Sequence, residues 1–298
     1  MAKDQLSKCL WIADVIRSHP KGITLERISN LWIHDPISEG RPLVRRTFIS
    51  YKKLIFDLFH LDIQCDPKTY EYTINQDSNH AEVSDWIMQS ASTNSIIQGA
   101  GDILDRIILE KVPSAGDNLR SMLDAIRAKR PVEFNYQAYT RTIPKKVSFE
   151  PYFVKIFKQR WYVVGRNMDD GKVKTYALDR MADPELTDGH VRMPESLNPS
   201  KYFDDAFGII VTHTKPQHIE IKCDSTQAKY LRALPLHSSQ QEMLGDGFSV
   251  FTYRMLLTAD LLNELLSYGS RIEVLSPTEL RTAIAAELRK ALDAYTPQ

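Results

Sequence analysis

The first part of the chain alternates helical repeats with turn-forming residues. Apolar side chains recur at helical spacing over residues 5–19, and a Pro-Lys-Gly step ends this repeat. Thr24 is positioned to cap a second amphipathic helix. After a loop, a third helical repeat covers residues 43–60, and residues 61–74 alternate and turn as a β-hairpin does. Three helices followed by a hairpin predict a winged helix-turn-helix domain over residues 1–76.

The third predicted helix has two faces of opposite character. Its apolar side chains gather on the face that would pack on the first two helices; they are Phe48, Tyr51, Ile55, Leu58 and Phe59. Residues 43–56 contain four Lys or Arg residues and no acid. A helix that enters the major groove needs basic and short polar side chains for phosphates and base edges. We therefore predict that duplex DNA contacts the opposite face, which consists of Arg45, Arg46, Ile49, Ser50 and Lys53. The alternative is a solvated helix face that happens to be basic.

Residues 77–116 are predicted to be a helical connection. Its apolar side chains are too many for a solvated linker; they include Val83, Ile87, Ile96, Ile97, Ile103, Leu104, Ile107 and Ile108. In DNA-binding proteins such an element often forms a dimer, because half-sites are usually bound by symmetric dimers. We therefore expect a homodimer, with packing of this region against the next domain as the alternative.

Short strands dominate residues 117–192. A helix over residues 119–129 ends before Pro131. Five strand-like runs follow, at residues 132–136, 147–154, 161–166, 173–178 and 182–187. Five short strands in so small a segment predict an Sm/SH3-like β-barrel.

The C-terminal part, residues 214–298, follows a predicted linker over residues 193–213. Its strand-like and helical runs come in the order β-α-β-β-α-β, and a last helix follows Pro277. That order is typical of a ferredoxin-like domain. The whole chain is therefore predicted to be a multidomain α+β protein with winged helix-turn-helix, Sm/SH3-like barrel and ferredoxin-like parts.

Charge is distributed unevenly, although the chain is neutral overall. The sequence has 38 Lys and Arg residues against 38 Asp and Glu residues. Residues 131–180 hold 10 cations against 5 acids, whereas residues 181–298 hold 11 against 16. A local positive field attracts anions whatever the net charge. The predicted barrel is therefore the part most suited to an anionic ligand.

Two segments of the barrel combine basic and aromatic side chains, residues 160–165 (Arg-Trp-Tyr-Val-Val-Gly) and residues 176–180 (Tyr-Ala-Leu-Asp-Arg). Along a strand, Arg160 and Tyr162 share one face and Trp161 lies on the other. Guanidinium groups bind phosphates, and aromatic rings stack on bases. We predict that a nucleotide or single-stranded nucleic acid contacts Tyr136, Lys146, Arg160, Tyr162, Arg166, Lys174 and Arg180. The alternative places Trp161 and Tyr162 in the barrel core beneath a solvated rim of cations, and for Trp161 we expect the core.

The same segments resemble the WYL-domain proteins. Trp161-Tyr162-Val163 stands where the family has Trp-Tyr-Leu, and the valine keeps an apolar strand residue. Further segments match the family's layout; they are Asn135-Tyr136, Glu150-Pro151-Tyr152 and Ala177-Leu178-Asp179-Arg180-Met181. Arg45-Arg46-Thr47-Phe48 is similar to the winged helices of bacterial WYL regulators, and residues 269–277 are similar to the family's C-terminal extension. The resemblance covers nearly the whole chain. It implies a bacterial transcriptional regulator whose DNA binding responds to a nucleotide or single-stranded nucleic acid in the WYL domain.

Motifs of enzymes and metal sites are missing from the sequence. It contains no His-Glu-x-x-His pair, Walker loop, Gly-x-Ser-x-Gly elbow or dinucleotide fingerprint. We therefore expect no catalytic residue, no metal and no cofactor. The three cysteines, Cys9, Cys65 and Cys223, have no metal-ligand spacing and suit a reduced cytosolic protein. The apolar runs are too short to span a bilayer and no signal peptide is apparent, so we expect a cytoplasmic protein with no membrane partner.

Two functions of different class fit these features. The first is a dimeric, ligand-responsive transcription factor, for which we expect repression, with activation as the alternative. The second is an RNA- or single-strand-binding regulatory partner of a nucleic-acid enzyme, in which the winged helix contacts protein.

Overall fold

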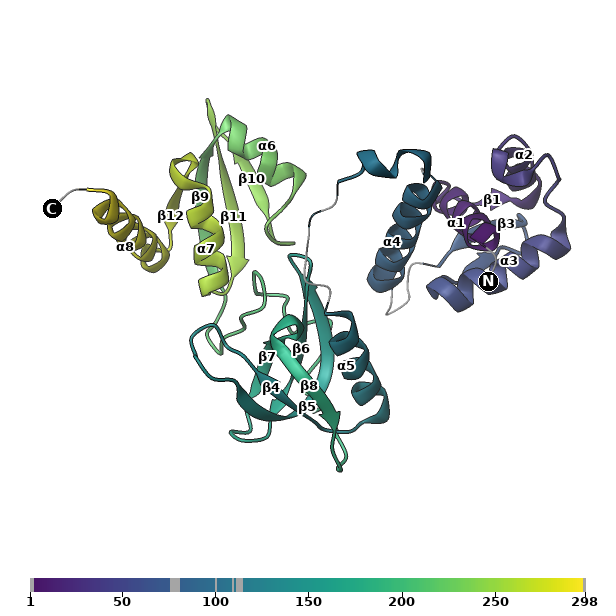
Figure 1. The fold of residues 1–298 in the computed structure, drawn as a ribbon. Coiled ribbons are helices and arrows are strands. Elements are labelled where there is room, and N and C mark those ends of the chain that lie inside the picture. The colour runs from purple at the N-terminus through teal and green to yellow at the C-terminus, as the bar shows by residue number, and fades with distance from the viewer. Residues whose placement is uncertain (1–2, 76–80, 100, 109, 111–114, 297–298) are drawn as a thin grey trace. The chain divides into compact units, whose positions relative to one another are not determined.

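A computed structural model describes residues 3–75, 81–99, 101–108, 110 and 115–296. By its internal contacts the chain divides into two compact units, Met1–Glu110 and Lys111–Gln298. The predicted boundary between residues 76 and 77 lies outside the described residues. Both units mix helices with antiparallel sheets (Figure 1).

The first unit contains helices and a small sheet in the order expected from the sequence. Its elements are α1 (Lys3–Arg17), β1 (Ile23–Thr24), α2 (Leu25–Ile33), η1 (Pro36–Ser38), α3 (Arg45–Phe59), β2 (Ile63–Cys65), β3 (Glu71–Ile74), α4 (Ala81–Gly99) and η2 (Gly101–Arg106). The antiparallel strands lie in the order β1-β3-β2. Thr24 caps α2 as predicted, since its side chain accepts a hydrogen bond of 3.3 Å from the backbone N–H of Arg27.

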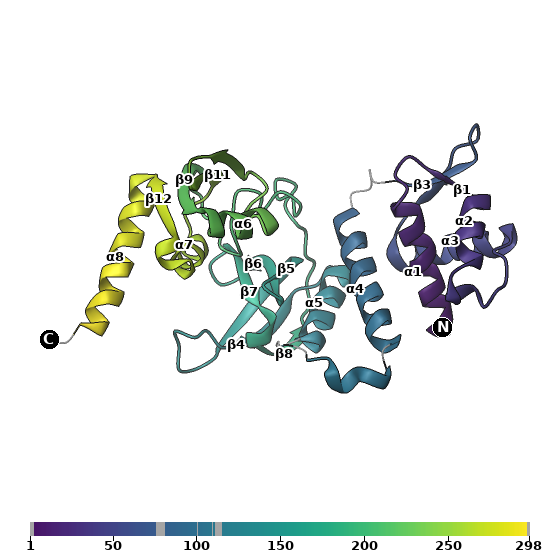
Figure 2. The ribbon, with the colours of Figure 1, turned by 90° about the horizontal axis from the view of Figure 1, so that it is seen from above.

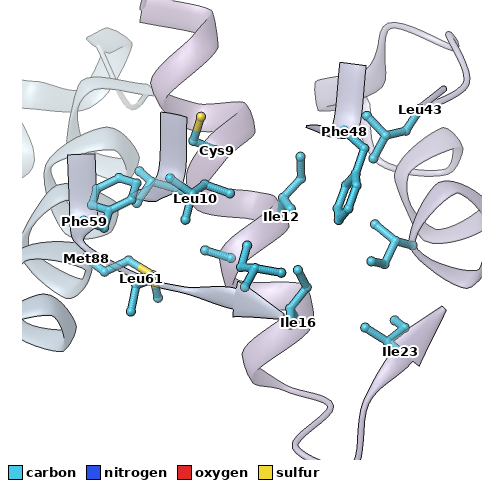
Figure 3. Packing of buried hydrophobic residues seen from close by; sticks show 14 of the residues in the cluster. Cys9, Leu10, Ile12, Ile16, Ile23, Leu43, Phe48, Phe59, Leu61 and Met88 are labelled. Carbon is cyan, nitrogen blue, oxygen red and sulfur yellow. The ribbon is translucent and has the colours of Figure 1, made fainter. Parts of the chain in front are cut away.

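One apolar core holds the first unit together. Figure 3 shows side chains of α1, among them Ile12, packed with Phe48 and Phe59 of α3. The predicted apolar face of α3 is thereby confirmed, because Phe48, Ile55 and Phe59 are buried. Met88 brings α4 into the same core. Several other apolar side chains of the helical connection remain exposed within the described residues, namely Val83, Ile96, Ile103, Leu104 and Ile108.

The second unit begins with a helix and five strands. They are α5 (Gly116–Ala128), β4 (Val132–Tyr136), β5 (Lys145–Phe157), β6 (Arg160–Asn167), β7 (Val173–Ala177), η3 (Leu178–Arg180) and β8 (Met181–Leu186). All neighbours are antiparallel in the order β7-β6-β5-β4-β8. The core of this part includes Phe134, Phe149, Val163 and Leu178, with Met122 of α5 packed against them. Trp161 also packs on this core, which confirms the expectation for its side chain.

A β-bulge interrupts the pairing of β5 with β6. Pro151 lies opposite Gly165 and Phe153 lies opposite Val164, so Tyr152 is the extra residue. A side chain at position 165 has no room, because a Cβ atom there would lie 2.1 Å from the carbonyl oxygen of Glu150. Glycine at this position therefore lets the two backbones approach.

The segment predicted as a linker packs on β5. The ring of Phe153 lies 5.6 Å from that of Tyr202, and the ring of Phe157 lies 5.6 Å from that of Phe207. Lys155 Nζ donates a hydrogen bond of 2.8 Å to the carbonyl oxygen of Gly208. Burial lowers the pKa of Lys155 to about 8. These contacts cover the face of β5 and β6 that points away from the core.

The last part alternates strands and helices as predicted. Its elements are β9 (Gln217–Asp224), α6 (Ser225–Ala233), β10 (Gln241–Leu244), β11 (Phe248–Met255), α7 (Ala259–Ser267), η4 (Gly269–Arg271), β12 (Ile272–Ser276) and α8 (Thr278–Tyr295). The antiparallel sheet has the order β10-β11-β9-β12. Every second side chain of β9, such as Ile219 and Ile221, joins one core with Leu231 of α6 and Leu261 of α7. Both helices therefore cover the same face of the sheet (Figure 2).

Replacing Gly165 by alanine tests the close approach at the bulge. The added methyl group would collide with the Glu150 carbonyl and with the Phe149 ring. We expect Gly165→Ala to destabilise this part by about 1–3 kcal/mol, measured as a lower midpoint of thermal unfolding. Gly116→Ala is the control, because nothing lies within 4 Å of a Cβ atom at that position. Equal stability of the two variants would contradict this account.

Candidate nucleic-acid interfaces

The first candidate surface is the outward face of α3. Arg45, Arg46, Ile49, Ser50 and Lys53 are all exposed. Burial of the opposite face of α3 in the core fixes this orientation. Among the described residues, no carboxylate forms an ion pair with Arg45, Arg46 or Lys53. The five residues thus form one exposed surface of three cations, one hydroxyl and one aliphatic side chain.

The residues predicted to bind a ligand in the second unit do not form one surface. Arg166 donates two hydrogen bonds to Glu150, of 2.7 and 2.6 Å. These bonds hold the pKa of the largely buried Glu150 carboxyl below its usual range. Lys174 pairs with Asp170, and Lys146 lies 2.7 Å from Glu133. Each of these three cations is therefore engaged by its own acid.

Arg160 lies at the other end of β6. Arg166 is six positions further along the chain, which corresponds to about 20 Å along a strand. The guanidinium of Arg160 pairs with Asp179 and donates a hydrogen bond of 3.2 Å to the hydroxyl of Tyr139. The guanidinium carbon of Arg180 lies 3.6 Å from the centre of the Tyr139 ring. We call Tyr136, Tyr139, Arg160, Asp179 and Arg180 the Tyr139 cluster.

Neighbouring elements hold the Tyr139 cluster in place. Asn118 of α5 donates 2.8 Å hydrogen bonds to the carbonyl oxygens of Leu178 and Met181, on either side of Asp179 and Arg180. The backbone N–H of Gln137 donates to the carbonyl oxygen of Arg180 over 3.0 Å. The turn that contains Asp179 and Arg180 is thus fixed from both sides.

The Tyr139 cluster contains buried polar atoms without hydrogen-bond partners. The Asp179 side chain is only 10 % exposed. Its Oδ1 atom, Arg160 Nε and Arg180 Nε are buried and have no hydrogen-bond partner among the described residues. Such atoms carry a desolvation cost unless a further group meets them. The hydrogen bond from Arg160 and the charge of Arg180 lower the pKa of Tyr139.

Two predicted tyrosines differ in their accessibility. Tyr136 is half-buried, and its hydroxyl accepts a hydrogen bond of 3.3 Å from the backbone N–H of Ala177. Tyr162 is 7 % exposed, and burial raises its pKa. The expectation that Tyr162 faces a ligand assumed that this face of the strand is open, but the segment containing Tyr202 and Phe203 packs on this face of the sheet.

Sequence reasoning missed two members of the Tyr139 cluster. Tyr139 lies in the segment between β4 and β5. This loop has no repeating pattern of apolar residues from which the position of a side chain could be predicted. Asp179 was part of the segment that carries the family resemblance, yet it was not assigned a role. A signal was available in the sequence, because an acid directly before Arg180 can satisfy a cation on a neighbouring strand.

A separate cavity lies beside the bulge. Its volume is about 540 Å³, and its lining includes Tyr152, Val191, His190 and the cations Lys129 and Arg192. It shares no lining residue with the Tyr139 cluster. Within the described parts of the chain, no group of three or more His, Cys, Asp and Glu side chains is arranged to hold a metal ion. No described helix has the length and apolar character needed to cross a membrane.

The arrangement of antiparallel sheets with a basic helix in a separate unit defines a multidomain mixed α/β protein. Models of two families match the second unit, the WYL domain over residues 117–186 and the WCX domain over residues 215–292. The chain is therefore a WYL-domain protein that also contains a WCX domain. The first match spans α5 to β8 and includes the whole Tyr139 cluster.

Solved structures similar to this chain were also found. One is proteasome accessory factor B/C (PafBC) of Arthrobacter aurescens, with 20% sequence identity and a TM-score of 0.38, covering 99% of this chain and 48% of that chain. The chain thus spans about half the length of that protein. Another is a CRISPR Cas-related protein, with 12% identity and a TM-score of 0.40, covering 98% of this chain and 85% of that chain. No curated protein matches the sequence.

The ion pair of Glu150 with Arg166 predicts a pH-dependent contribution to stability. Because folding lowers the pKa of Glu150, the pair stabilises the protein above the usual glutamate pKa, and this contribution is lost as the pH falls below about 4. Arg166 is half-exposed, so we expect Glu150→Gln to cost about 1 kcal/mol near neutral pH and much less in acid. The midpoints of thermal unfolding of the wild type and Glu150→Gln, near neutral pH and in acid, measure this difference in stability. Glu195→Gln, which removes an exposed pair with Arg192, should change neither midpoint.

Proposed function

We propose that this WYL-domain protein regulates transcription by binding duplex DNA through α3 and a nucleotide or single-stranded nucleic acid at the Tyr139 cluster. The observation that carries the proposal is the exposed face of α3, whose cations form no ion pair within the described chain. Unpaired cations on a helix can neutralise phosphates and reach base edges without first breaking a bond inside the protein. The helix also stands before a strand pair, β2 and β3, as in a winged helix-turn-helix domain.

The finer fold and assembly belong to the same proposal. We assign the first unit to the winged helix-turn-helix class, α5 to β8 to an Sm/SH3-like barrel, and β9 to α8 to a ferredoxin-like domain. The strand orders β7-β6-β5-β4-β8 and β10-β11-β9-β12 support the last two assignments. We further infer a homodimer that acts as a cytoplasmic repressor. The exposed apolar side chains of α4 and η2 support a dimer, because symmetric half-sites need two α3 helices.

The proposed ligand site contains fewer of the residues that the sequence analysis assigned to it. Arg160 and Arg180 remain in it, because each has a buried Nε atom with no hydrogen-bond partner among the described residues. Tyr136 remains because its hydroxyl interacts with Arg180. Arg166, Lys174 and Lys146 are left out, since an acid already neutralises each of them. Tyr162 is left out because its ring is buried. Of the predicted cations, Arg180 alone has no ion pair among the described residues. A planar base can stack on its guanidinium, as the ring of Tyr139 does.

Removing two α3 cations tests DNA binding. Arg46→Ala with Lys53→Ala should weaken binding to a duplex selected from random sequence by the purified protein. We expect a loss of about 30-fold or more, because one base-contacting arginine alone is worth about 1–3 kcal/mol. The dependence of affinity on salt should also become less steep, since fewer phosphates are neutralised. Fluorescence anisotropy of the labelled duplex measures both effects.

A control with the same change in charge is available outside the first unit. Lys229→Ala with Arg289→Ala removes two exposed cations from α6 and α8 and should leave the affinity unchanged. Sequence-specific duplex binding that survives the α3 substitutions would overturn the assignment. If the wild-type protein selects no duplex sequence at all, the second candidate is favoured instead, an RNA- or single-strand-binding partner of a nucleic-acid enzyme.

Replacing Arg180 tests the sensor site. Arg180→Ala removes the stacking surface, so single-stranded DNA should bind more weakly by a factor of about 5–150, which corresponds to one lost stack of about 1–3 kcal/mol. Duplex binding in the absence of this ligand should be unchanged. Lys174→Ala is the control, because Lys174 is paired with Asp170 near the opposite end of the strands. Equal effects of the two substitutions would show that the site is misplaced.

A further inference from the structure

Tyr139 covers the surface that a stacked ligand would need. Its ring centre lies 3.6 Å from the guanidinium carbon of Arg180, which is the spacing of a cation–π stack. Its hydroxyl accepts a hydrogen bond of 3.2 Å from Arg160. A flat ring with one acceptor toward a guanidinium is also what a nucleobase would present there. The side chain of Tyr139 thus makes the contacts expected of a ligand.

Tyr139 is held mainly by these two contacts. Its side chain is 72 % exposed, and it does not belong to the core that includes Phe134 and Phe149. Tyr136, three residues earlier, does pack on that core. Ile143, in the same segment between β4 and β5, is also exposed. Moving Tyr139 away from Arg180 would therefore expose little buried apolar surface.

Even with Tyr139 in place, the polar atoms of the cluster are incompletely satisfied. Two buried donors, Arg160 Nε and Arg180 Nε, and one buried acceptor, Asp179 Oδ1, have no hydrogen-bond partner among the described residues. Tyrosine brings a single hydroxyl, which cannot serve all three. A nucleotide offers phosphate and carbonyl oxygens for the donors and an amino group for the carboxylate. The cluster is thus better matched to a nucleotide than to Tyr139.

We propose that Tyr139 is a placeholder that occupies the stacking surface of Arg180 in the ligand-free protein and is displaced by the nucleobase of the ligand. This inference rests on the proposed function of the Tyr139 cluster as a nucleotide or single-strand sensor. The apparent dissociation constant is the intrinsic one divided by the fraction of open protein. Tyr139 therefore weakens ligand binding and raises the ligand concentration at which the sensor responds.

Substitution of Tyr139 tests the placeholder in the full-length protein. The probe is a fluorescein-labelled single-stranded DNA hexamer of mixed sequence, followed by anisotropy. We expect Tyr139→Ala to bind the hexamer about 3–10 times more tightly than the wild type, because the ligand no longer has to displace the exposed stack on Arg180 and the hydrogen bond from Arg160. Tyr139→Phe keeps the ring but loses that hydrogen bond, so its affinity should fall between the two.

The matched control is Tyr295→Ala, which removes a tyrosine that is 88 % exposed at the end of α8 and should have no effect. Weaker binding by Tyr139→Ala would overturn the proposal, since the ring would then belong to the bound state. Unchanged binding would overturn it as well. If Arg180→Ala weakens binding while Tyr139→Ala does not strengthen it, the placeholder fails and the sensor site stands. If no variant binds the hexamer, or Arg180→Ala binds as the wild type does, the sensor site fails too.

A spectroscopic titration reports the displacement directly. In the free protein, the hydrogen bond from Arg160 and the nearby cations hold the pKa of Tyr139 below its usual value. Displacement by the hexamer should raise this pKa toward its usual value. The titration of Tyr139 is obtained by subtracting the tyrosinate absorbance of Tyr139→Phe from that of the wild type at each pH. A tyrosinate titration that the hexamer leaves unchanged would contradict displacement.

Discussion

The ion pair between Asp179 and Arg160 is the interaction on which the candidate sensor site depends. Asp179 lies in the turn after β7 and is almost fully covered, so its charge needs a partner within the protein. Removing one member of a buried pair typically costs about 3–5 kcal/mol. The pair therefore holds the guanidinium of Arg160 at the end of β6. The guanidinium of Arg180, the next residue in the turn, stacks on the ring of Tyr139.

The two candidate surfaces use their cations differently. On α3 the cations have no acidic partner among the described residues, so their charge acts on the surroundings and favours any polyanion. In the WYL domain most cations of residues 131–180 pair with a nearby acid, so fewer of them are available to a polyanion. Binding there relies on shape, stacking and particular hydrogen bonds. A broad electrostatic surface suits DNA, whereas a small polar cluster suits a signal molecule.

The sequence predicted the elements well because their signals are local. The helical period of α3 separates Phe48 and Ile55 from Arg46 and Lys53 without any tertiary information. The ion partners of Arg160 and Arg166 could not be predicted in this way, because each pair joins residues 16 or 19 positions apart in the chain. Burial of Tyr162 was missed for a similar reason, since the covering segment follows β8 and has no regular period. Tyr139 lies in a loop, where the spacing of residues says little about side-chain contacts.

Photochemical cross-linking most directly tests whether the Tyr139 cluster contacts nucleic acid. A single-stranded DNA that contains 5-iodouracil would be irradiated with the full-length protein, and the attached peptide identified by mass spectrometry. We expect attachment within residues 136–141 or 176–181, and loss of that product when unlabelled single strand competes. Attachment confined to the first unit, at α3 or at β2 and β3, would contradict a separate sensor in the WYL domain.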